Sequence, residues 1–468
     1  MNLKNSLLVI SVASFFAISC NVLSQEPKSA VSSDHVIYNE RTSQIALNGL
    51  YSQLQNGNYY GGNLLVLGDV SSDISQSVGT WDFYRAMDTY TTNVGNLEVE
   101  DFWEQAYATI NQANNIIAKV PPLDNVSQET KDQILGEAYF IRALAYFDLN
   151  RAFGGVEGVY GSMGVPLVLQ PTNTITENSF PSRPSINKTY AQVESDLKQA
   201  IELLSGSSTP TRASEAAAKA LLSRLFLYYQ QDYGLVEKYA TEVITAYDYQ
   251  LLEDYASIFI SEETAGSIFE LSFTASDQSD IRFWYFPPSL GGRADIALHQ
   301  SFVNLLQSRV NDERAKLIAF DDGVGVYYPT KYQKVSGKDN VIILRLAEMY
   351  LNRAEARTRK ESPDLNGALS DLNIIRNRAG LADTTGAGVD TAREILDAIA
   401  LERSIEFFEE GHRWFNLVRT ERAMTVLNGI DRKNSGPVSL NEAGRQVWPI
   451  PQREIDANKN IEQNEAYN

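Results

Sequence analysis

Few residues in this chain are spaced for catalysis. The three histidines, His35, His299 and His412, lie far apart, and none belongs to a His-x-x-x-His or Glu-x-x-His pattern, so no zinc site or acid–base histidine is predicted. A hydrolase needs two opposed carboxylates, but no motif singles out a pair among the 59 acidic residues. A P-loop, Gly-x-Gly-x-x-Gly and Gly-x-Ser-x-Gly are also missing from the sequence. We therefore predict a protein that is not an enzyme and has no catalytic residues or cofactor.

The single cysteine, Cys20, offers a different chemistry. It has no partner for a disulfide or a Cys-x-x-Cys site. The residues before it, "MNLKNSLLVISVASFFAIS", place Lys4 ahead of an apolar run and end in small residues. This layout is typical of a secretory signal and is too short to span a bilayer as a helix.

Two interpretations of Cys20 compete. Ala17 and Ser19 fit an ordinary signal peptidase site, which would leave a free N-terminal thiol. The stretch "AISC" is also similar to a bacterial lipoprotein box, although that box usually has Leu at the position of Ala17. We favour the second interpretation, because the exported chain otherwise excludes cysteine. Residues 1–19 would then be a lipoprotein signal peptide, and the acyl chains on Cys20 would hold residues 20–468 at a membrane, at about 0.8 kcal/mol per buried methylene.

Composition narrows the range of partners. The chain has 40 basic and 59 acidic residues and a net charge of −19, which argues against nucleic acid or anionic lipid headgroups as the main partner. The chain also has 24 Tyr, 19 Phe and 5 Trp. Tyr and Trp can bury most of their ring while exposing a polar group to solvent or to a ligand. At 468 residues the chain exceeds the usual core of about 100–200 residues, which indicates several domains or a repeat array.

Most of the sequence has the pattern of paired amphipathic helices. Between Gln133 and Phe153, apolar residues recur at steps of three and four, and Gly154-Gly155 follows. The stretches Ser214–Gly234 and Val341–Lys360 repeat this arrangement, each followed by a polar turn and a second helix. The spacing of small and aromatic residues is similar to that of tetratricopeptide repeats. We predict an all-α dominated fold, a tetratricopeptide-like superhelix of helical hairpins with a few short strands.

Two segments interrupt the helical pattern, at about 57–96 and 273–335. Both are rich in Gly, Ser and aromatic residues, and long irregular insertions in a repeat scaffold tend to carry binding surfaces. By contrast, Trp103 and Trp414 lie on helical spacing and are expected in the core. Charged residues near the C-terminal end are interpreted as a structural ion-pair network rather than a catalytic group: Glu402, Arg403, Glu406 and Arg413.

Several motifs then converge on one family. "EAYFIRALAYFDLNRAFGG" with a following "GVPLV", "LRLAEMYLNRAEA", "LERSIEFFEEGHRWFNLVR" and "WPIPQREIDANKNIEQNEAY" occur in this order. Together they resemble the SusD/RagB family of outer-membrane lipoproteins from Bacteroidetes, over nearly the whole chain after Cys20. The sequence departs from the family pattern at "VEGVYGSMG", which follows the Gly-Gly turn, and at Asn416, Lys459 and Ala466.

The resemblance implies a single SusD-like domain at 20–468 on the cell surface, tethered to the outer membrane by Cys20. Such a protein captures oligosaccharide or polysaccharide and delivers it to a SusC-like TonB-dependent transporter. Two alternatives stay open. One is capture of peptides, as in the RagB branch, and the other is a transporter lid with little affinity of its own.

A sugar site needs rigid aromatic platforms for the apolar C–H faces and a few polar groups for orientation. The family places ligand-binding aromatics in insertions that match the two found here. The alternative for each residue is packing beneath a long loop. Calcium near the aspartates of "GDVSSDI" is not supported, because a dedicated Asp-x-Asp-x-Asp-Gly pattern is absent. The predicted ligand-binding residues are Trp81, Tyr84, Trp284, Tyr285, Asp73, Asp82 and Tyr327.

Overall fold

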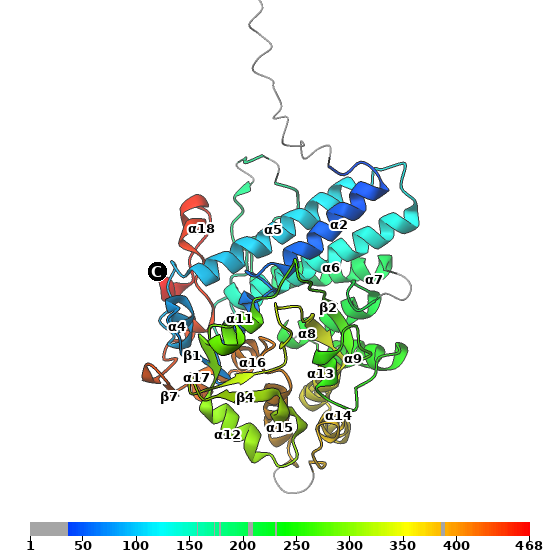
Figure 1. The fold of residues 1–468 in the computed structure, drawn as a ribbon. Helices are drawn as coiled ribbons and strands as arrows, with labels where there is room; N and C mark the ends of the chain where they lie inside the picture. Colours follow the sequence, from blue (N-terminus) through cyan, green and yellow to red (C-terminus); the bar gives the residue numbers. More distant parts are fainter. Residues whose placement is uncertain are drawn as a thin grey trace, which may run out of the picture.

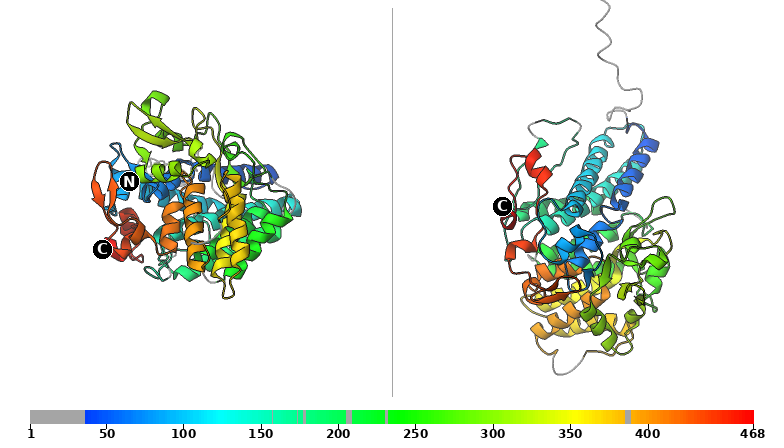
Figure 2. Two further views of the ribbon diagram at one scale, coloured as in Figure 1. Left: turned by 90° about the horizontal axis from the view of Figure 1, so that it is seen from below. Right: turned by 60° about the vertical axis from the view of Figure 1, so that its left-hand side comes forward.

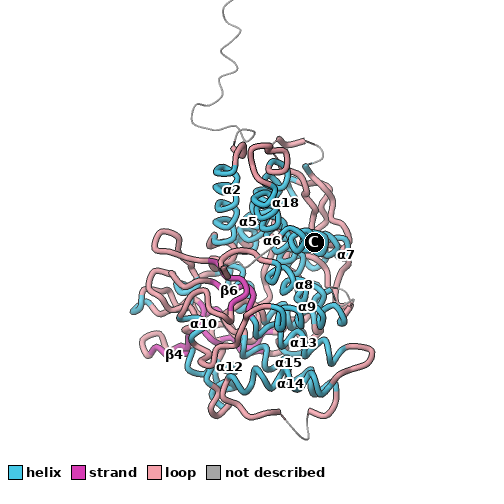
Figure 3. Tube along the Cα trace, turned by 90° about the vertical axis from the view of Figure 1, so that its right-hand side faces the viewer, coloured by secondary structure: helices cyan, strands magenta, loops and turns pink. Residues whose placement is uncertain are grey.

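The computed structural model describes residues 36–156, 158–172, 174–176, 179–204, 209–229, 232–384 and 389–468. Cys20 and the predicted signal peptide at 1–19 lie outside this part of the chain. Helices dominate the structure, and the strands are short (Figures 1 and 3). The predicted helix-rich fold is therefore confirmed.

A series of antiparallel helices forms the scaffold. Neighbouring members pack in the order α2, α5, α6, α7, α8, α9, α13 and α14, and α15 covers α13 and α14. Seen from below, α9 and α13–α15 lie side by side as a layer (Figure 2). The scaffold helices are α2 (Glu40–Gln55), α5 (Leu97–Lys119), α6 (Gln128–Phe153), α7 (Ile186–Leu203), α8 (Glu215–Tyr229), α9 (Tyr233–Ala246), α13 (Leu346–Arg359), α14 (Leu365–Arg378), α15 (Ala392–Glu406) and α16 (Arg413–Arg419).

Local sequence explains where these helices begin. Ser127 caps α6 by accepting a hydrogen bond from the backbone N–H of Thr130, so this helix starts five residues earlier than the apolar pattern suggested. It ends at Phe153, directly before the Gly-Gly pair, as predicted. Thr391 and Glu394 form a reciprocal capping box at the start of α15. Short polar side chains at these positions satisfy N–H groups that the helix itself leaves without partners.

Helix α6 is more buried than an amphipathic pattern predicts. Nearly every side chain from Ile134 to Phe153 is buried, polar ones included. Asp148 is one of these, and its carboxylate accepts hydrogen bonds of 2.7 Å from both Tyr59 and Tyr60 and pairs with Arg151 at 2.7 Å. Buried charge is tolerated here because it is paired and hydrogen-bonded. The helix therefore lies at the centre of the scaffold rather than on its surface.

The scaffold is interrupted twice by segments with other structure. The first contains α3 (Asn63–Val70), β1 (Ser75–Ser77) and α4 (Asp82–Asp88). The second runs from the end of α9 to the start of α13. Its elements are α10 (Ser257–Ile260), β2 (Ser267–Leu271), α11 (Ile281–Tyr285), η4 (Pro288–Leu290), β3 (Ile296–Leu298), α12 (Gln300–Ser308), η5 (Glu313–Leu317), β4 (Ile318–Asp321), β5 (Val326–Pro329) and β6 (Val341–Arg345).

These segments correct two expectations from the sequence. The segment 57–96 is not irregular throughout, since all eight residues of α3 form a buried helix. The sequence predicts that a helix begins at Val341. Residues Val341–Arg345 instead form strand β6, which pairs antiparallel with β2. A short apolar run of this kind fits a buried strand and a buried helix equally well, and only the pairing partner decides between them.

The C-terminal segment returns to the N-terminal helices. It contains α17 (Ala423–Val426), β7 (Ile430–Arg432), β8 (Gly436–Val438), η6 (Ala443–Gln446), α18 (Gln452–Ala457) and η7 (Glu465–Tyr467). The backbone N–H of Trp448 donates to the carbonyl of Ala152 at 2.7 Å, at the end of α6. Trp103 and Trp414 are each 2% exposed, so their predicted core positions are confirmed.

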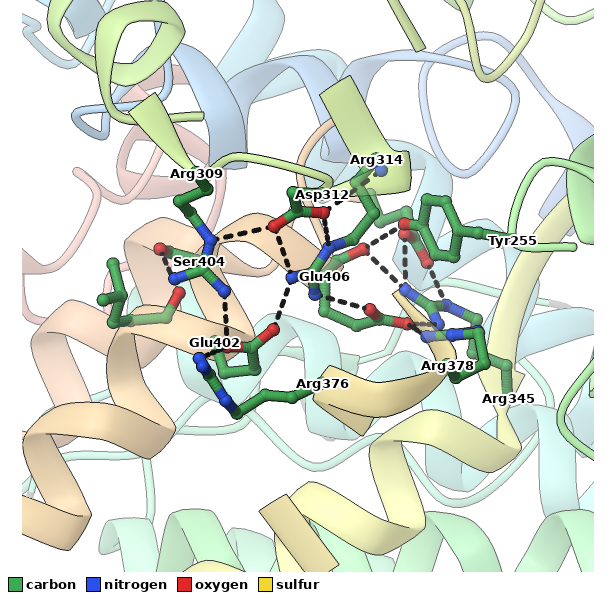
Figure 4. A network of polar contacts seen from close by, with 12 residues as sticks. Tyr255, Arg309, Asp312, Arg314, Arg345, Arg376, Arg378, Glu402, Ser404 and Glu406 are labelled. Carbon is green, nitrogen blue, oxygen red and sulfur yellow. Dashed lines mark hydrogen bonds and ion pairs between the residues drawn. The ribbon is translucent and has the colours of Figure 1, made fainter. Parts of the chain in front are cut away.

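A network of buried ion pairs joins the scaffold to the second segment (Figure 4). Glu402 and Glu406 of α15 are 1% and 0% exposed. Arg314 forms ion pairs with both glutamates, and Glu406 also forms ion pairs with Arg345 and Arg378. The interpretation of these glutamates as structural is confirmed. Arg413 belongs to a separate pair, because it forms a bidentate contact with Asp73 at 2.7 and 2.8 Å.

Candidate functional site

Two strands hold the separate segments of the candidate site together. In register, β1 pairs antiparallel with β3, from Ser75 opposite Leu298 to Ser77 opposite Ile296. Beyond the strands, the backbone N–H groups of Val78 and Gly79 donate to the carbonyl of Asp295 at 2.8 and 3.1 Å. A side chain at Gly79 would place its Cβ 1.7 Å from Asp295 Oδ1. Glycine is therefore required for the two segments to approach this closely.

The pairing brings aromatic rings from both segments into contact. The ring centroids of Trp81 and Trp284 are 5.8 Å apart. Tyr84 meets Trp284 edge to face at 5.0 Å, Phe283 meets it at 5.4 Å, and Phe83 meets Trp81 at 5.9 Å. These separations are in the range where aromatic pairs attract one another. We call Trp81, Phe83, Tyr84, Phe283 and Trp284 the aromatic cluster.

Polar groups fix the orientation of the cluster. The indole Nε1 of Trp81 donates to Glu98 Oε1 at 2.7 Å, where α5 begins beside α4. Burial raises the pKa of Glu98 above its usual value. The guanidinium of Arg293 lies over both indoles, 5.5 Å from the Trp81 ring centroid and 5.4 Å from that of Trp284, and pairs with Asp295 at 2.8 Å. The two tryptophans are therefore half-buried and held from several sides.

An open groove borders the cluster at Phe283. It has a volume of about 320 Å³ and is lined by parts of 278–283, 290–291 and 335–337. Its apolar residues Phe283, Leu290 and Val335 are 42%, 47% and 73% exposed. Gln278 and Asp280 add exposed polar groups to the same lining. The groove thus combines apolar surface with hydrogen-bonding groups, as a site for a ligand with both characters requires.

Comparisons with known proteins place this geometry in context. A model of the "SusD family" matches residues 314–467, and one described as "Starch-binding associating with outer membrane" matches residues 23–227. A SusD-like protein of Formosa agariphila, P38, is 24% identical, and the match covers 96% of each chain. The starch-binding protein SusD of Bacteroides thetaiotaomicron is 32% identical over 35% of this chain and 30% of its own.

Solved structures agree with the sequence matches. A SusD superfamily protein of Bacteroides thetaiotaomicron is 28% identical with a TM-score of 0.78, covering 91% of this chain and 99% of that one. The chain belongs to the SusD/RagB family. A laminarin-binding SusD-like protein has the same fold, with a TM-score of 0.76 at 23% identity over 92% of this chain and 100% of its own. SusD-like proteins form a starch- and glycan-binding family associated with the outer membrane. None of the helices described here has the length and apolarity needed to span a bilayer.

In this SusD-like chain, the structure brings together three of the predicted site residues. Trp81 and Trp284 are half-buried members of the aromatic cluster, and Tyr84 lies beneath them at 1% exposure. Tyr285 is also 1% exposed and points elsewhere, with its hydroxyl 3.3 Å from Asp69 Oδ2. Tyr84 and Tyr285 are therefore placed to support the site rather than to contact a ligand at the surface.

The other three predicted residues lie outside the cluster. Both carboxylate oxygens of Asp73 are engaged by Arg413. Asp82 begins α4 with its side chain 84% exposed and contacts Arg85 at 3.2 Å. Tyr327 lies on β5 and packs against Phe320 of β4, with ring centroids 4.7 Å apart. Their predicted contact with a ligand stays a prediction.

Reasoning from sequence missed Phe283 and Arg293. Phe283 stands in the same "RFWYFPP" stretch as Trp284, and only its exposure distinguishes it from the buried Phe286. Arg293 follows in "GGRAD" and reaches the cluster through the β1–β3 pairing. Among the described residues, no group of three or more His, Cys, Asp or Glu is arranged to hold a metal ion.

Proposed function

We propose that this chain is a glycan-binding lipoprotein of the outer-membrane surface. In this proposal the acylated Cys20 anchors the protein, and the domain captures oligosaccharide or polysaccharide and delivers it to a SusC-like TonB-dependent transporter. It acts by binding and does not cleave its ligand. The family membership supports the glycan class and the membrane association.

One observation carries the proposal at the level of residues. Trp81 and Trp284, from segments some two hundred positions apart, are in contact with their ring planes 46° apart, and the exposed ring of Phe283 meets Trp284 edge to face. A pyranose ring can stack its apolar face on one of these rings, while its hydroxyl groups require donors and acceptors at the edge. Gln278 and Asp280 of the adjoining groove and the guanidinium of Arg293 supply them.

Affinity electrophoresis tests the proposal directly. The chain lacking residues 1–20 is run through gels that contain soluble plant, algal, fungal or bacterial polysaccharides. We expect one class of polymer to retard the protein. Trp81→Ala and Trp284→Ala should remove that retardation, whereas Tyr38→Ala, at a 56% exposed ring outside the cluster, should not change it.

Two other results of the electrophoresis would contradict parts of the proposal. Equal retardation of the wild-type protein and both tryptophan variants, all shown to be folded by circular dichroism, would remove the aromatic cluster as the site. No retardation by any polymer would favour peptide capture or a transporter lid. Co-purification with the transporter, with and without added peptide, would then separate these two alternatives.

A further inference from the structure

A second pocket, which shares no residue with the aromatic cluster, lies among helices α13, α15 and α16. Five arginines line it, together with a single carboxylate, that of Glu355. We call it the arginine pocket and define it by Arg359, Arg403, Arg413, Arg419, Arg422 and Glu355.

Most of the positive charge in the arginine pocket has a counterion. Arg419 and Arg359 both pair with Glu355, at 2.8 Å each. The other two pairs reach outside the lining, since Arg413 contacts Asp73 at 2.7 Å and Arg422 contacts Asp397 at 2.6 Å. Five guanidinium groups therefore face three carboxylates, which leaves a net formal charge of +2.

Arg403 is the group that lacks a counterion. It is 4% exposed, and no carboxylate of the described chain lies within ion-pair distance of it. Its Nη1 donates to the neutral oxygen Oδ1 of Asn352 at 2.7 Å, and its buried Nε has no hydrogen-bond partner. Burial, with the neighbouring charge of Arg419, lowers the pKa of Arg403 to about 10, and the more distant carboxylates of Glu355 and Glu348 offset this only in part. An ionised group in such a position is costly unless it is compensated.

The neutral residues of the lining do not supply the missing acceptor. The hydroxyls of Ser404 and Thr420 donate to backbone carbonyls of their own helices, at 2.7 and 2.6 Å. The side-chain oxygen of Asn416 already accepts from Arg419 Nε at 2.9 Å. The pocket thus combines positive charge with an unused N–H donor, and its acceptors are engaged.

The free space in the arginine pocket is small. It amounts to about 20 Å³, close to the minimum room of one water molecule. A single-atom anion needs little more than this, whereas a tetrahedral oxyanion would have to displace arginines of the lining. The most exposed arginines of the lining are Arg359 and Arg422, with side chains 26% and 30% exposed.

We propose that the arginine pocket binds one small inorganic anion of the size of chloride. The anion accepts the hydrogen bond that Arg403 Nε does not make elsewhere and neutralises its charge. Because the lining comes from α13, α15 and α16, the bound anion joins three helices of the scaffold and stabilises the folded state. The site is independent of glycan binding.

Thermal unfolding at constant ionic strength tests this proposal. Sodium chloride replaces sodium gluconate stepwise, because gluconate is too large for the pocket. We expect chloride to raise the Tm of the wild-type protein in a saturable way, by about 1–3 °C. Arg403→Gln should abolish the chloride dependence. Arg453→Gln, which alters a 72% exposed arginine outside the pocket, should leave it unchanged.

Two outcomes of this titration would overturn the proposal. The first is a wild-type Tm that does not depend on chloride, or that depends on it as strongly in Arg403→Gln. The second is a rise that depends on Arg403 with sulfate but not with chloride. If Arg403→Gln does not fold, bromide in crystals of the wild-type protein gives the answer. An anomalous peak beside Arg403 Nε supports the site, and water alone at that position refutes it.

Discussion

Replacing Glu406 by Gln should destabilise the protein more than any exposed charge substitution. Glu406 is 0% exposed and accepts hydrogen bonds from three arginines, Arg314, Arg345 and Arg378. Removing one partner from a buried ion pair costs about 3–5 kcal/mol, because the remaining charge is left uncompensated.

The neighbouring contacts place the expected loss at the lower end of this range. Arg314 keeps Asp312 and Glu402, and Arg345 keeps Glu410. Arg378 has no second carboxylate partner in the described part of the chain. One buried guanidinium is therefore orphaned, and we expect Glu406→Gln to lower the free energy of unfolding by about 3 kcal/mol.

Urea denaturation followed by circular dichroism measures this loss as a lower midpoint. The control is Glu313→Gln, whose partner is the exposed Lys316 and which should cost at most about 1 kcal/mol. Adding Arg378→Met to Glu406→Gln should restore part of the stability, because it removes the orphaned charge. A loss below about 1 kcal/mol in Glu406→Gln, or no recovery in the double variant, would refute this account of the network.

The pH dependence of the same variant has a definite sign. Burial alone would raise the pKa of Glu406, but Arg378, Arg345 and Arg314 together hold it well below its usual range. Because the pKa of Glu406 is lower in the folded chain than in the unfolded chain, where it is about 4.3, the carboxylate stabilises the folded state at pH values above about 4.3. This stabilisation is lost as the pH falls below about 4.3. The stability difference between wild type and Glu406→Gln should therefore shrink below that pH.

Two further predictions concern buried carboxyl groups near the site. Burial raises the pKa of Asp69 to about 8, so the folded chain favours the protonated carboxyl, and the stability that this group contributes is full below about pH 4 and is lost as the pH rises towards 8. Asp69→Asn should therefore raise the Tm relative to wild type more at pH 9 than at pH 5. An equal difference in Tm at both pH values would contradict this. Glu98→Ala should weaken glycan binding about tenfold, since Trp81 loses a charge-assisted hydrogen bond. Glu98→Gln should restore most of the affinity, and identical dissociation constants for the three proteins in calorimetry would show that Glu98 does not position Trp81.

The scaffold could be predicted from sequence because its signals are local. Apolar spacing and a Gly-Gly stop lie within one stretch, and they located the end of α6 at Phe153 and its start to within five residues. The β6 strand was missed because its partner β2 lies about seventy positions away. Pairing between distant segments leaves no mark in either segment alone.

The candidate site depends on the same kind of non-local information. The tryptophans were chosen for their type and their place in insertions, and their contact became visible only with the β1–β3 register. Consecutive residues of a helix point about 100° apart, which is why Trp284 joins the cluster while Tyr285 faces the interior. Residue type could not distinguish these two neighbours.

The contact between α9 and α13 has a consequence for engineering. These helices are neighbours, joined by Glu237 with Arg357 at 2.9 Å, although residues 247–345 intervene in sequence. The intervening segment therefore leaves the row of scaffold helices after α9 and returns to it beside α9, at α13. A chain with this connectivity tolerates exchange of the segment for one of different length, provided that the two ends still meet and that the new segment keeps arginines to pair with the buried Glu402 and Glu406 of α15. If the aromatic cluster is the glycan site, as proposed, transplanting 247–345 between relatives together with its partner strand β1 should transfer the ligand preference of the donor to an unchanged framework.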